Sequence, residues 1–282
     1  MHVCVIIPAH NEAKYISECL YSFVHQTQPP EELIVVDDNS GDTTFELASS
    51  FARDYSWITA VQHRSSSEHL PGEKVIRAFN FGLRHASNDY DLIGKFDADI
   101  ILPTNYFEQM RNHFKGNWLL GMCAGLLYVE RKEKWVYENI AKKSHVRGPI
   151  KLYYRQVFEL MGKLRLGTGW DTVDTLLCQY HDFEIKTDSS LRVKHLRPTG
   201  HSYSTKNFRA KGEALYKMRY GLPLAKLALL KMAWQSKSLR LFLQGIFGYF
   251  NAIINRIPRF VTQEEGLFIR RLRWKGILGK MR

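Results

Sequence analysis

Polar clusters that directly follow short apolar runs constrain the fold of this 282-residue chain more than any other feature. Residues 3–8, 33–36 and 91–96 are short, mainly apolar runs, as expected of strands buried on both faces. Helix-like stretches separate them. This alternation predicts a parallel α/β sheet with crossover helices. Because ligands of such sheets bind beyond the carboxyl ends of the strands, we expect the polar clusters to converge on one crevice.

The same pattern predicts the remaining elements. We expect a helix that opens at Asn11 and Glu12, a helix from about Thr43, a strand near 58–61 and a helix over 73–85. Further on, we expect strands over 118–130 and 191–195, with a short helix over 171–180 between them. From residue 206 the chain is helical, basic and apolar together. We therefore predict a catalytic domain over 1–205 and a helical region over 206–282.

The positive charge of the chain is concentrated in its last quarter. Residues 206–282 hold 17 Lys and Arg against 3 Asp and Glu, a local +14, whereas residues 1–205 hold 23 against 25, a local −2; together they give the net +12. A basic end of this kind points to an acidic surface, either anionic lipid or nucleic acid.

Cysteine usage and the N-terminal sequence bear on location. The four cysteines show no CxxC pair and no dense disulfide pattern, which is typical of reduced core residues. The N-terminal residues lack the basic stretch of a signal peptide, and no apolar run reaches the length of about 18 residues needed to span a bilayer. We expect a cytoplasmic protein.

The sharpest short motif is Asp97-Ala98-Asp99. In an extended segment, residues two apart project to one side, so both carboxylates can share a ligand. Two hard oxygen donors suit Mg²⁺ or Mn²⁺ shared with a substrate diphosphate. The alternative is a pair of solvated turn aspartates. The position of the motif at the end of a buried strand, opposite two other polar strand ends, favours the metal.

Two further positions are candidates for nucleotide contacts. Asp38 follows the second strand, where a carboxylate can accept a hydrogen bond from a base N–H or a ribose hydroxyl; turn formation and helix capping are its alternative roles. Lys74 stands at the start of a predicted helix, where its ammonium and the helix N-terminus can both meet a phosphate; the alternative is a surface lysine.

The second half of the chain offers a catalytic base. Asp171 and Asp174 lie three residues apart and share a face of the predicted helix. A carboxylate there can take the proton of an attacking hydroxyl. Helix capping explains Asp171 well and Asp174 less completely, so we favour Asp174 as the base.

Taken together, these segments resemble the family 2 glycosyltransferases of GT-A fold, over roughly residues 3–200. The matching stretches are Val5-Ile6-Ile7-Pro8-Ala9-His10-Asn11-Glu12, Ile34-Val35-Val36-Asp37-Asp38-Asn39-Ser40, Gly72-Glu73-Lys74 and Phe96-Asp97-Ala98-Asp99. The segment that begins Gly169-Trp170-Asp171 is similar to the acidic motif of the family, which more often reads Glu-Asp.

The resemblance implies a nucleotide-diphosphate sugar donor, with UDP favoured by its frequency in the family, an inverting single displacement and a divalent metal. It implies that the donor is bound by Pro8, Ala9, Asn11, Glu12, Asp38, Lys74 and Asp97. Within that set, Asp38 would contact the base and Asp97 the ribose or the water shell of the metal. Asp99 would bind the metal, with His195, at the end of a predicted strand, as a further ligand; a lone strand histidine is otherwise structural.

The basic tail mixes large apolar side chains with cations. Apolar helical faces flanked by Lys, Arg and Trp fit helices that lie in a bilayer interface and are drawn to anionic lipid. We therefore expect peripheral attachment to the inner face of the cell membrane and a lipid-linked or polysaccharide acceptor. The alternative is a helical cap packed on the catalytic domain.

Two other functions remain as alternatives. A sugar-nucleotidyltransferase shares the α/β architecture but needs a Gly-rich, Arg-bearing loop after its first strand, where this chain has Pro8-Ala9-His10-Asn11-Glu12. A non-catalytic nucleic-acid-binding protein would place cations and stacking aromatics on a polar face. Here the cations interrupt aliphatic runs, so we expect no nucleic-acid partner.

Overall fold

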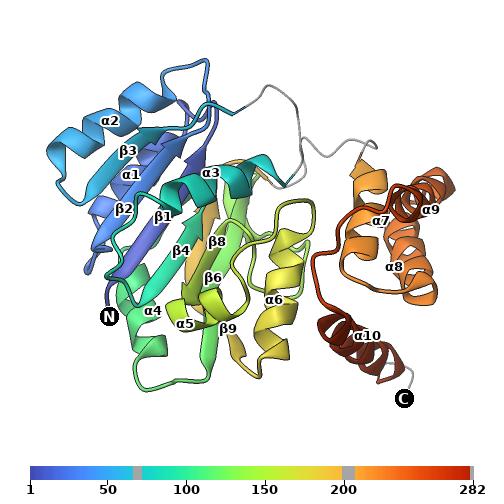
Figure 1. Ribbon diagram of the computed structural model, residues 1–282. Coiled ribbons are helices and arrows are strands. Elements are labelled where there is room, and N and C mark those ends of the chain that lie inside the picture. Colours follow the sequence, from blue (N-terminus) through green and yellow to red (C-terminus); the bar gives the residue numbers. More distant parts are fainter. Residues whose placement is uncertain (66–71, 199–206, 280–282) are drawn as a thin grey trace. The chain divides into compact units, whose positions relative to one another are not determined.

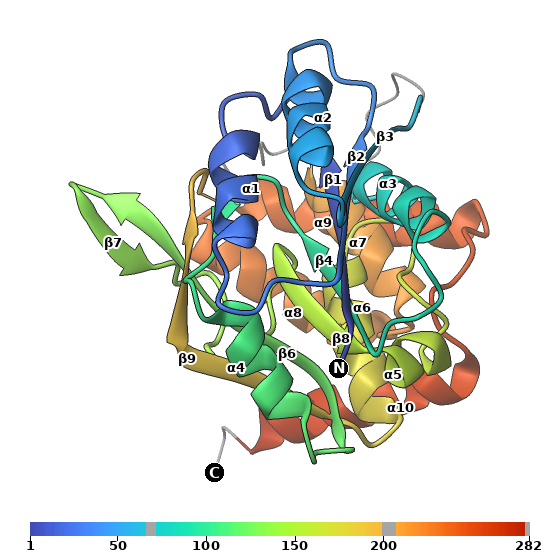
Figure 2. The same ribbon diagram turned by 90° about the vertical axis from the view of Figure 1, so that its left-hand side faces the viewer.

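A computed structural model describes residues 1–65, 72–198 and 207–279. It has the predicted α/β architecture, a mixed sheet with helices on both faces, and helices follow in the C-terminal region (Figures 1 and 2). The elements in chain order are β1 (Val3–Ala9), α1 (Ile16–Val24), β2 (Glu32–Asp37), α2 (Thr44–Asp54), β3 (Ile58–Gln62), α3 (Lys74–Leu83), β4 (Leu92–Phe96), β5 (Ile100–Ile101), α4 (Tyr106–Phe114), β6 (Leu120–Arg131), β7 (Lys134–Tyr137), β8 (Ile150–Tyr154), α5 (Arg155–Leu160), α6 (Trp170–Tyr180), β9 (Glu184–His195), α7 (Asn207–Lys217), α8 (Leu222–Gln235), α9 (Leu239–Ile254) and α10 (Gln263–Leu278).

The strand order of the sheet is β3-β2-β1-β4-β8-β6-β9-β5, and β7 pairs with β6. The first four strands are parallel, as the alternation of strands and helices predicts. Strand β8 then inserts antiparallel between β4 and β6. The sequence pattern did not reveal β8, because its buried Lys151 interrupts an otherwise apolar run.

Both faces of the sheet are covered by helices. On one face, Phe96 of β4 packs against Phe23 of α1 and Phe107 of α4, with ring centroids 5.7 Å apart in both pairs. On the other face, α3 lies close to the sheet at Gly82, where a Cβ atom would stand 2.7 Å from the Ile6 side chain. The layers hold the strand ends, and therefore the candidate site, on a rigid frame.

Two elements begin more than two residues away from the expected position. The first helix begins at Ile16, not at Asn11. Asn11 has a φ of 55°, which a right-handed helix excludes, and its side chain accepts a hydrogen bond from the backbone of Gly41 instead. Strand β9 begins at Glu184, seven residues before the expected start, because it pairs with β6 along its length despite its polar sequence.

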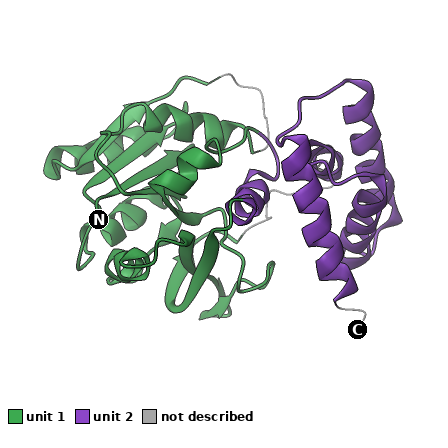
Figure 3. Ribbon diagram, turned by 60° about the horizontal axis from the view of Figure 1, so that its bottom comes forward, with its two compact units in different colours: residues 1–166, 181–198 green, residues 167–180, 199–282 purple. Residues whose placement is uncertain are grey.

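The chain divides into two compact units (Figure 3). The first contains residues 1–166 and 181–198, and the second contains residues 167–180 with the described part of 199–282. Helix α6 therefore groups with the C-terminal helices, and Tyr180 meets Phe268 of α10 with ring centroids 5.5 Å apart. The expected boundary at 205/206 lies outside the described residues.

Among the helices of residues 1–65, 72–198 and 207–279, none is long and apolar enough to cross a bilayer.

Candidate functional site

The loops after β1 and β2 are joined at the carboxyl ends of these neighbouring strands. Pro8 and Ala9 are the last two residues of β1, and Ala9 pairs with Asp37 of β2. The backbone N–H of Asn11 donates to the Ser40 hydroxyl oxygen at 2.9 Å, and the Asn11 side-chain oxygen accepts from Gly41 N at 2.8 Å. The structure thus brings two of the predicted polar clusters into one site.

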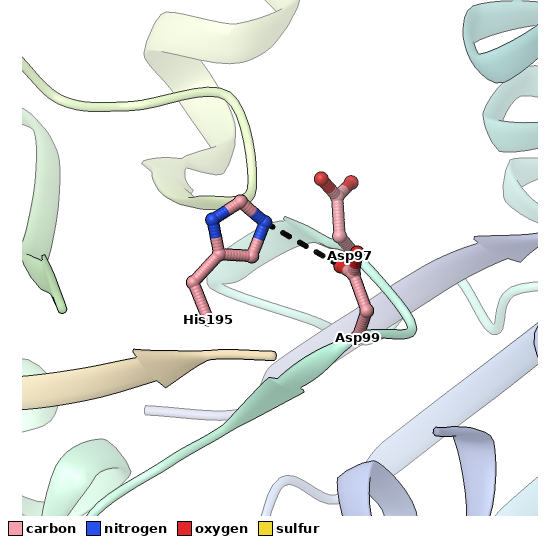
Figure 4. A group of neighbouring side chains, drawn as sticks. All are labelled: Asp97, Asp99 and His195. Atoms are coloured by element: carbon pink, nitrogen blue, oxygen red, sulfur yellow. Dashed lines mark ion pairs between the residues drawn. The ribbon is translucent and has the colours of Figure 1, made fainter. Parts of the chain in front are cut away.

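Three candidate metal ligands meet beside these loops (Figure 4). They are Asp97, Asp99 and His195, and one donor atom from each lies within 4.8 Å of the other two. Pairing between the short strand β5 and the end of β9 brings His195 to the motif: Ile100 pairs with His195, and Leu196 N donates to the Asp99 carbonyl oxygen at 2.8 Å.

This donor set fits a divalent cation. Ligands about 2.1 Å from an octahedral ion are separated by up to about 4.2 Å, so small side-chain movements would let one ion reach all three groups. Carboxylates suit Mg²⁺ and Mn²⁺ alike, while an imidazole nitrogen suits transition metals and so favours Mn²⁺.

Buried charges surround the ligands. Asp99 and His195 are 4% exposed, and His195 Nε2 lies 3.6 Å from Asp99 Oδ1. Burial alone would lower the pKa of His195, but the neighbouring carboxylates of Asp99 and Glu138 raise it to about 9. Burial alone would raise the pKa of Asp99, but His195 and then Arg197 bring it below the ordinary value.

Arg197 links the metal ligands to the loop after β1. One guanidinium nitrogen, Nη2, is 3.1 Å from Asp99 Oδ2 and also forms an ion pair with Glu12. Glu12 is 8% exposed; burial raises its pKa, and Arg197 partly offsets this. Glu12 Oε2 has no hydrogen-bond partner within the described residues. Glu12, which was expected at the donor site, therefore shares the guanidinium group of Arg197 with Asp99.

Sequence reasoning missed two charged groups beside the ligands. Lys95, 2% exposed on β4, forms an ion pair with Asp97. Glu138 is equally buried, and its Oε2 lies 3.3 Å from His195 Nδ1 and 3.0 Å from Arg147 Nη2. A lysine inside an apolar strand just before the DxD motif was a usable signal for Lys95. Nothing local distinguishes Glu138, which follows β7.

Two aspartates stand at the end of β2. Asp38 is 5% exposed, and its Oδ1 lies 2.8 Å from His63 Nδ1. Its backbone oxygen lies 2.7 Å from His10 Nδ1, which ties the turn to the loop after β1. Asp37 is 2% exposed, and its Oδ1 has no hydrogen-bond partner within the part of the chain that the structure describes. A buried oxygen of this kind needs a hydrogen-bond donor, which a water or a bound ligand can supply.

The remaining candidates stand on helices. Lys74 is the first residue of α3 and is partly exposed. Asp171 and Asp174 both lie on α6, in the second unit, whereas the other candidates belong to the first. Asp174 is 1% exposed and accepts a hydrogen bond from Thr175 N at 2.6 Å, while Asp171 is partly exposed.

Comparison with known proteins identifies similar chains. A poly(ribitol-phosphate) beta-glucosyltransferase of Bacillus spizizenii is 35% identical over 69 residues, 24% of this chain and 11% of that protein. The mannosyltransferase PcManGT of Pyrobaculum calidifontis, solved with GDP-Man and Mn²⁺, is 17% identical with a TM-score of 0.60, over 97% of this chain and 80% of that one. S. aureus TarS, solved with UDP, is 18% identical with a TM-score of 0.55, over 76% of this chain and 66% of that one.

These structures share the GT-A fold with the present chain. The chain spans between 11% and 45% of the length of the first curated relatives it matches. The sequence profile described as Glycosyl transferase family 2 matches residues 4–170, more than half of the chain. The chain therefore belongs to glycosyl transferase family 2.

Proposed function

We propose that this protein is an inverting, divalent-metal-dependent glycosyltransferase that moves a sugar from a nucleotide-diphosphate donor, with UDP as the first candidate, to an acceptor hydroxyl. The observation that carries the proposal is the convergence of Asp97, Asp99 and His195 beside the ends of β1 and β2. TarS was solved with UDP and PcManGT with GDP-Man and Mn²⁺, which supports a nucleotide-sugar donor here.

Each group has a proposed part in donor binding. Asp38, held by His63, offers its second carboxylate oxygen to the base or ribose, and Asp37 Oδ1 is a further acceptor at the same strand end. Pro8, Ala9, Asn11 and Glu12 line the donor site from the loop after β1. Lys74 contacts a phosphate from the start of α3. Asp97, Asp99 and His195 would hold Mn²⁺ or Mg²⁺, which would offset the charge that develops on the departing diphosphate.

The reaction would be a single displacement. The acceptor oxygen attacks the anomeric carbon, the bond from that carbon to the diphosphate oxygen breaks, and the nucleoside diphosphate leaves. Asp174, with Asp171 as the alternative, takes the acceptor proton. We place this chemistry in residues 1–205 and the attachment of the protein to its acceptor surface in residues 206–282.

Nucleotide titration tests the donor site. UDP, GDP and dTDP are titrated by calorimetry with and without Mn²⁺ into the wild type, Asp99→Ala and the control Asp89→Ala, whose side chain is 92% exposed in the same unit. We expect one nucleotide to bind in a metal-dependent way to the wild type and the control, but not to Asp99→Ala. Binding of none of the three contradicts the proposal. Release of pyrophosphate from a nucleoside triphosphate and a sugar phosphate would favour a nucleotidyltransferase instead.

We also propose that residues 206–282 attach the enzyme to the cytoplasmic, anionic surface of a membrane, where a lipid-linked or polysaccharide acceptor would be reached. Exposed apolar side chains recur at helical spacing along α9 and α8. They are Leu239, Leu243, Phe247, Phe250 and Ile254 on α9, and Leu227, Leu230 and Trp234 on α8. Lys226, Lys231, Lys237 and Arg240 adjoin them. Apolar stripes flanked by cations favour an anionic bilayer interface.

Vesicle sedimentation tests the attachment. We expect binding to phosphatidylcholine vesicles that contain phosphatidylserine, weakened by salt and by Trp234→Ser. The control is Trp118→Ser, because Trp118 is 74% exposed in the first unit against 82% for Trp234. If both variants lose vesicle binding equally, or if the wild type does not bind vesicles, the C-terminal helices are better explained as a cap packed on the catalytic domain. A salt-sensitive shift with RNA or DNA in place of vesicle binding would favour the nucleic-acid alternative.

A further inference from the structure

We propose that Glu138 is a positioning residue for the metal site: its carboxylate binds Nδ1 of His195 and so aims Nε2 of the ring at the metal. The proposal rests on the metal-dependent function proposed above, and it assigns a role to a residue that no motif marks.

The geometry places the two ring nitrogens in different surroundings. His195 Nδ1 lies 3.3 Å from Glu138 Oε2, and His195 Nε2 lies 3.6 Å from Asp99 Oδ1. The side chains of His195 and Glu138 are 5% and 2% exposed, so water does not compete for either contact. With a carboxylate on Nδ1, the neutral ring keeps its proton there and presents the lone pair of Nε2 to a cation.

Glu138 is itself held in place. Its backbone N–H donates to the Leu127 carbonyl oxygen at 2.9 Å, which fixes the residue against β6 just after β7 ends. Arg147 Nη2 lies 3.0 Å from the same Oε2 that meets His195. A buried carboxylate needs such partners to remain charged. Arg147 therefore contacts Glu138, Glu138 contacts His195, and His195 contacts Asp99 of the DxD motif.

An exclusively structural role is the competing interpretation, with Glu138 serving only as the counter-ion of Arg147. The two roles differ in one measurable respect. A positioning residue acts on metal affinity through His195, and its effect vanishes when His195 is absent. A structural residue weakens the site whether or not His195 is present.

The experiment measures Mn²⁺ affinity in the presence of UDP by electron paramagnetic resonance of the free ion. Four variants are compared with the wild type: Glu138→Ala, Glu138→Gln, His195→Ala and the double variant Glu138→Ala/His195→Ala. Glu133→Ala is the control, because Glu133 lies in the exposed turn between β6 and β7. Thermal unfolding of each variant checks that it folds.

We expect Glu138→Ala to weaken Mn²⁺ binding about 10- to 100-fold, the usual effect of losing such a partner. Glu138→Gln should lose less Mn²⁺ affinity, because the amide oxygen of Gln can still accept a hydrogen bond from His195 Nδ1–H. The double variant should bind as His195→Ala does, and Glu133→Ala as the wild type does. If Glu138→Ala does not fold, Glu138→Gln and its combination with His195→Ala decide the question by the same comparison.

Two results overturn the proposal while leaving the metal-dependent function intact. One is unchanged Mn²⁺ affinity in Glu138→Ala and Glu138→Gln. The other is a further loss when Glu138→Ala is added to His195→Ala. If the wild type binds no Mn²⁺ with any of UDP, GDP or dTDP, the metal-dependent function falls, and the role of Glu138 falls with it.

Discussion

At the scale of residues, the candidate metal site is a group of paired charges. Asp97 has Lys95 as its partner, and Asp99 has Arg197 and His195. For Asp99, which is buried, this pairing keeps the pKa of the carboxyl below its ordinary value, where a lone buried charge would be strongly disfavoured. It also means that an incoming cation competes with cations the protein already supplies, so ligand protonation and metal binding are linked.

The raised pKa of His195 predicts a pH-dependent stability in metal-free protein. Its folded pKa of about 9 lies above the unfolded value of 6.5. The protonated ring therefore stabilises the fold, and this contribution is present in full below pH 6.5. This contribution, up to about 3 kcal/mol, is lost as pH rises through 9. Urea unfolding in EDTA should show the advantage of wild type over His195→Asn shrinking between pH 6.5 and 9. A difference that stays constant over this range would contradict the assignment.

At the scale of elements, close helix packing organises the second unit. Helix α7 approaches α9 through glycines on both helices. A Cβ atom on Gly212 of α7 would overlap the backbone oxygen of Gly245 of α9, and one on Gly248 of α9 would overlap the backbone oxygen of Arg209. Backbone cannot move aside as a side chain can, so the helices must separate if a side chain is added.

A single methyl group tests this packing. We expect Gly212→Ala to lower the free energy of unfolding by about 1–3 kcal/mol, because the added group forces α7 from α9. Gly276→Ala in α10 is the matched control: nothing lies within 4 Å of its Cβ position, so it should stabilise by up to about 1 kcal/mol through helix propensity. Chemical denaturation measures both. Equal effects of the two substitutions would show that the α7–α9 contact is looser than described.

At the scale of the whole molecule, the proposed donor site and the candidate base belong to different compact units. The candidate metal ligands Asp97, Asp99 and His195 lie in the first unit, and Asp171 and Asp174 lie in the second. Donor binding and sugar transfer should therefore be separable by substitution, because every residue proposed for the donor site lies in the first unit and none lies on α6.

Asp174→Asn tests this separation. We expect nucleotide and Mn²⁺ affinity to stay at the wild-type level while kcat falls about 10²- to 10⁴-fold, the usual contribution of a general base. Calorimetry gives the affinities, and release of the nucleoside diphosphate gives kcat. Asp171→Asn is the paired comparison. A larger fall in kcat for Asp171→Asn than for Asp174→Asn would assign the base to Asp171.

Much of the first unit could be predicted from local sequence. The apolar runs that became β1, β2 and β4 and the polar clusters at their ends are local signals, because strand burial and turn chemistry depend on near neighbours. Strand β8 was missed because Lys151 interrupts its apolar run, and most of β9 was missed because pairing with β6 stabilises a sequence that looks polar in isolation.

The sequence by itself therefore determined the α/β fold, the family and the motif Asp97-Ala98-Asp99, because these follow from short-range periodicity and spacing. Only the tertiary structure decided that the carboxylate of Glu138 meets the Nδ1 atom of His195, 57 residues further along the chain. It also decided that α6 groups with the C-terminal helices. The physical reason is that long-range pairing and packing set these contacts. The strand register between β5 and β9 brings His195 to Asp99, and no local pattern records that register.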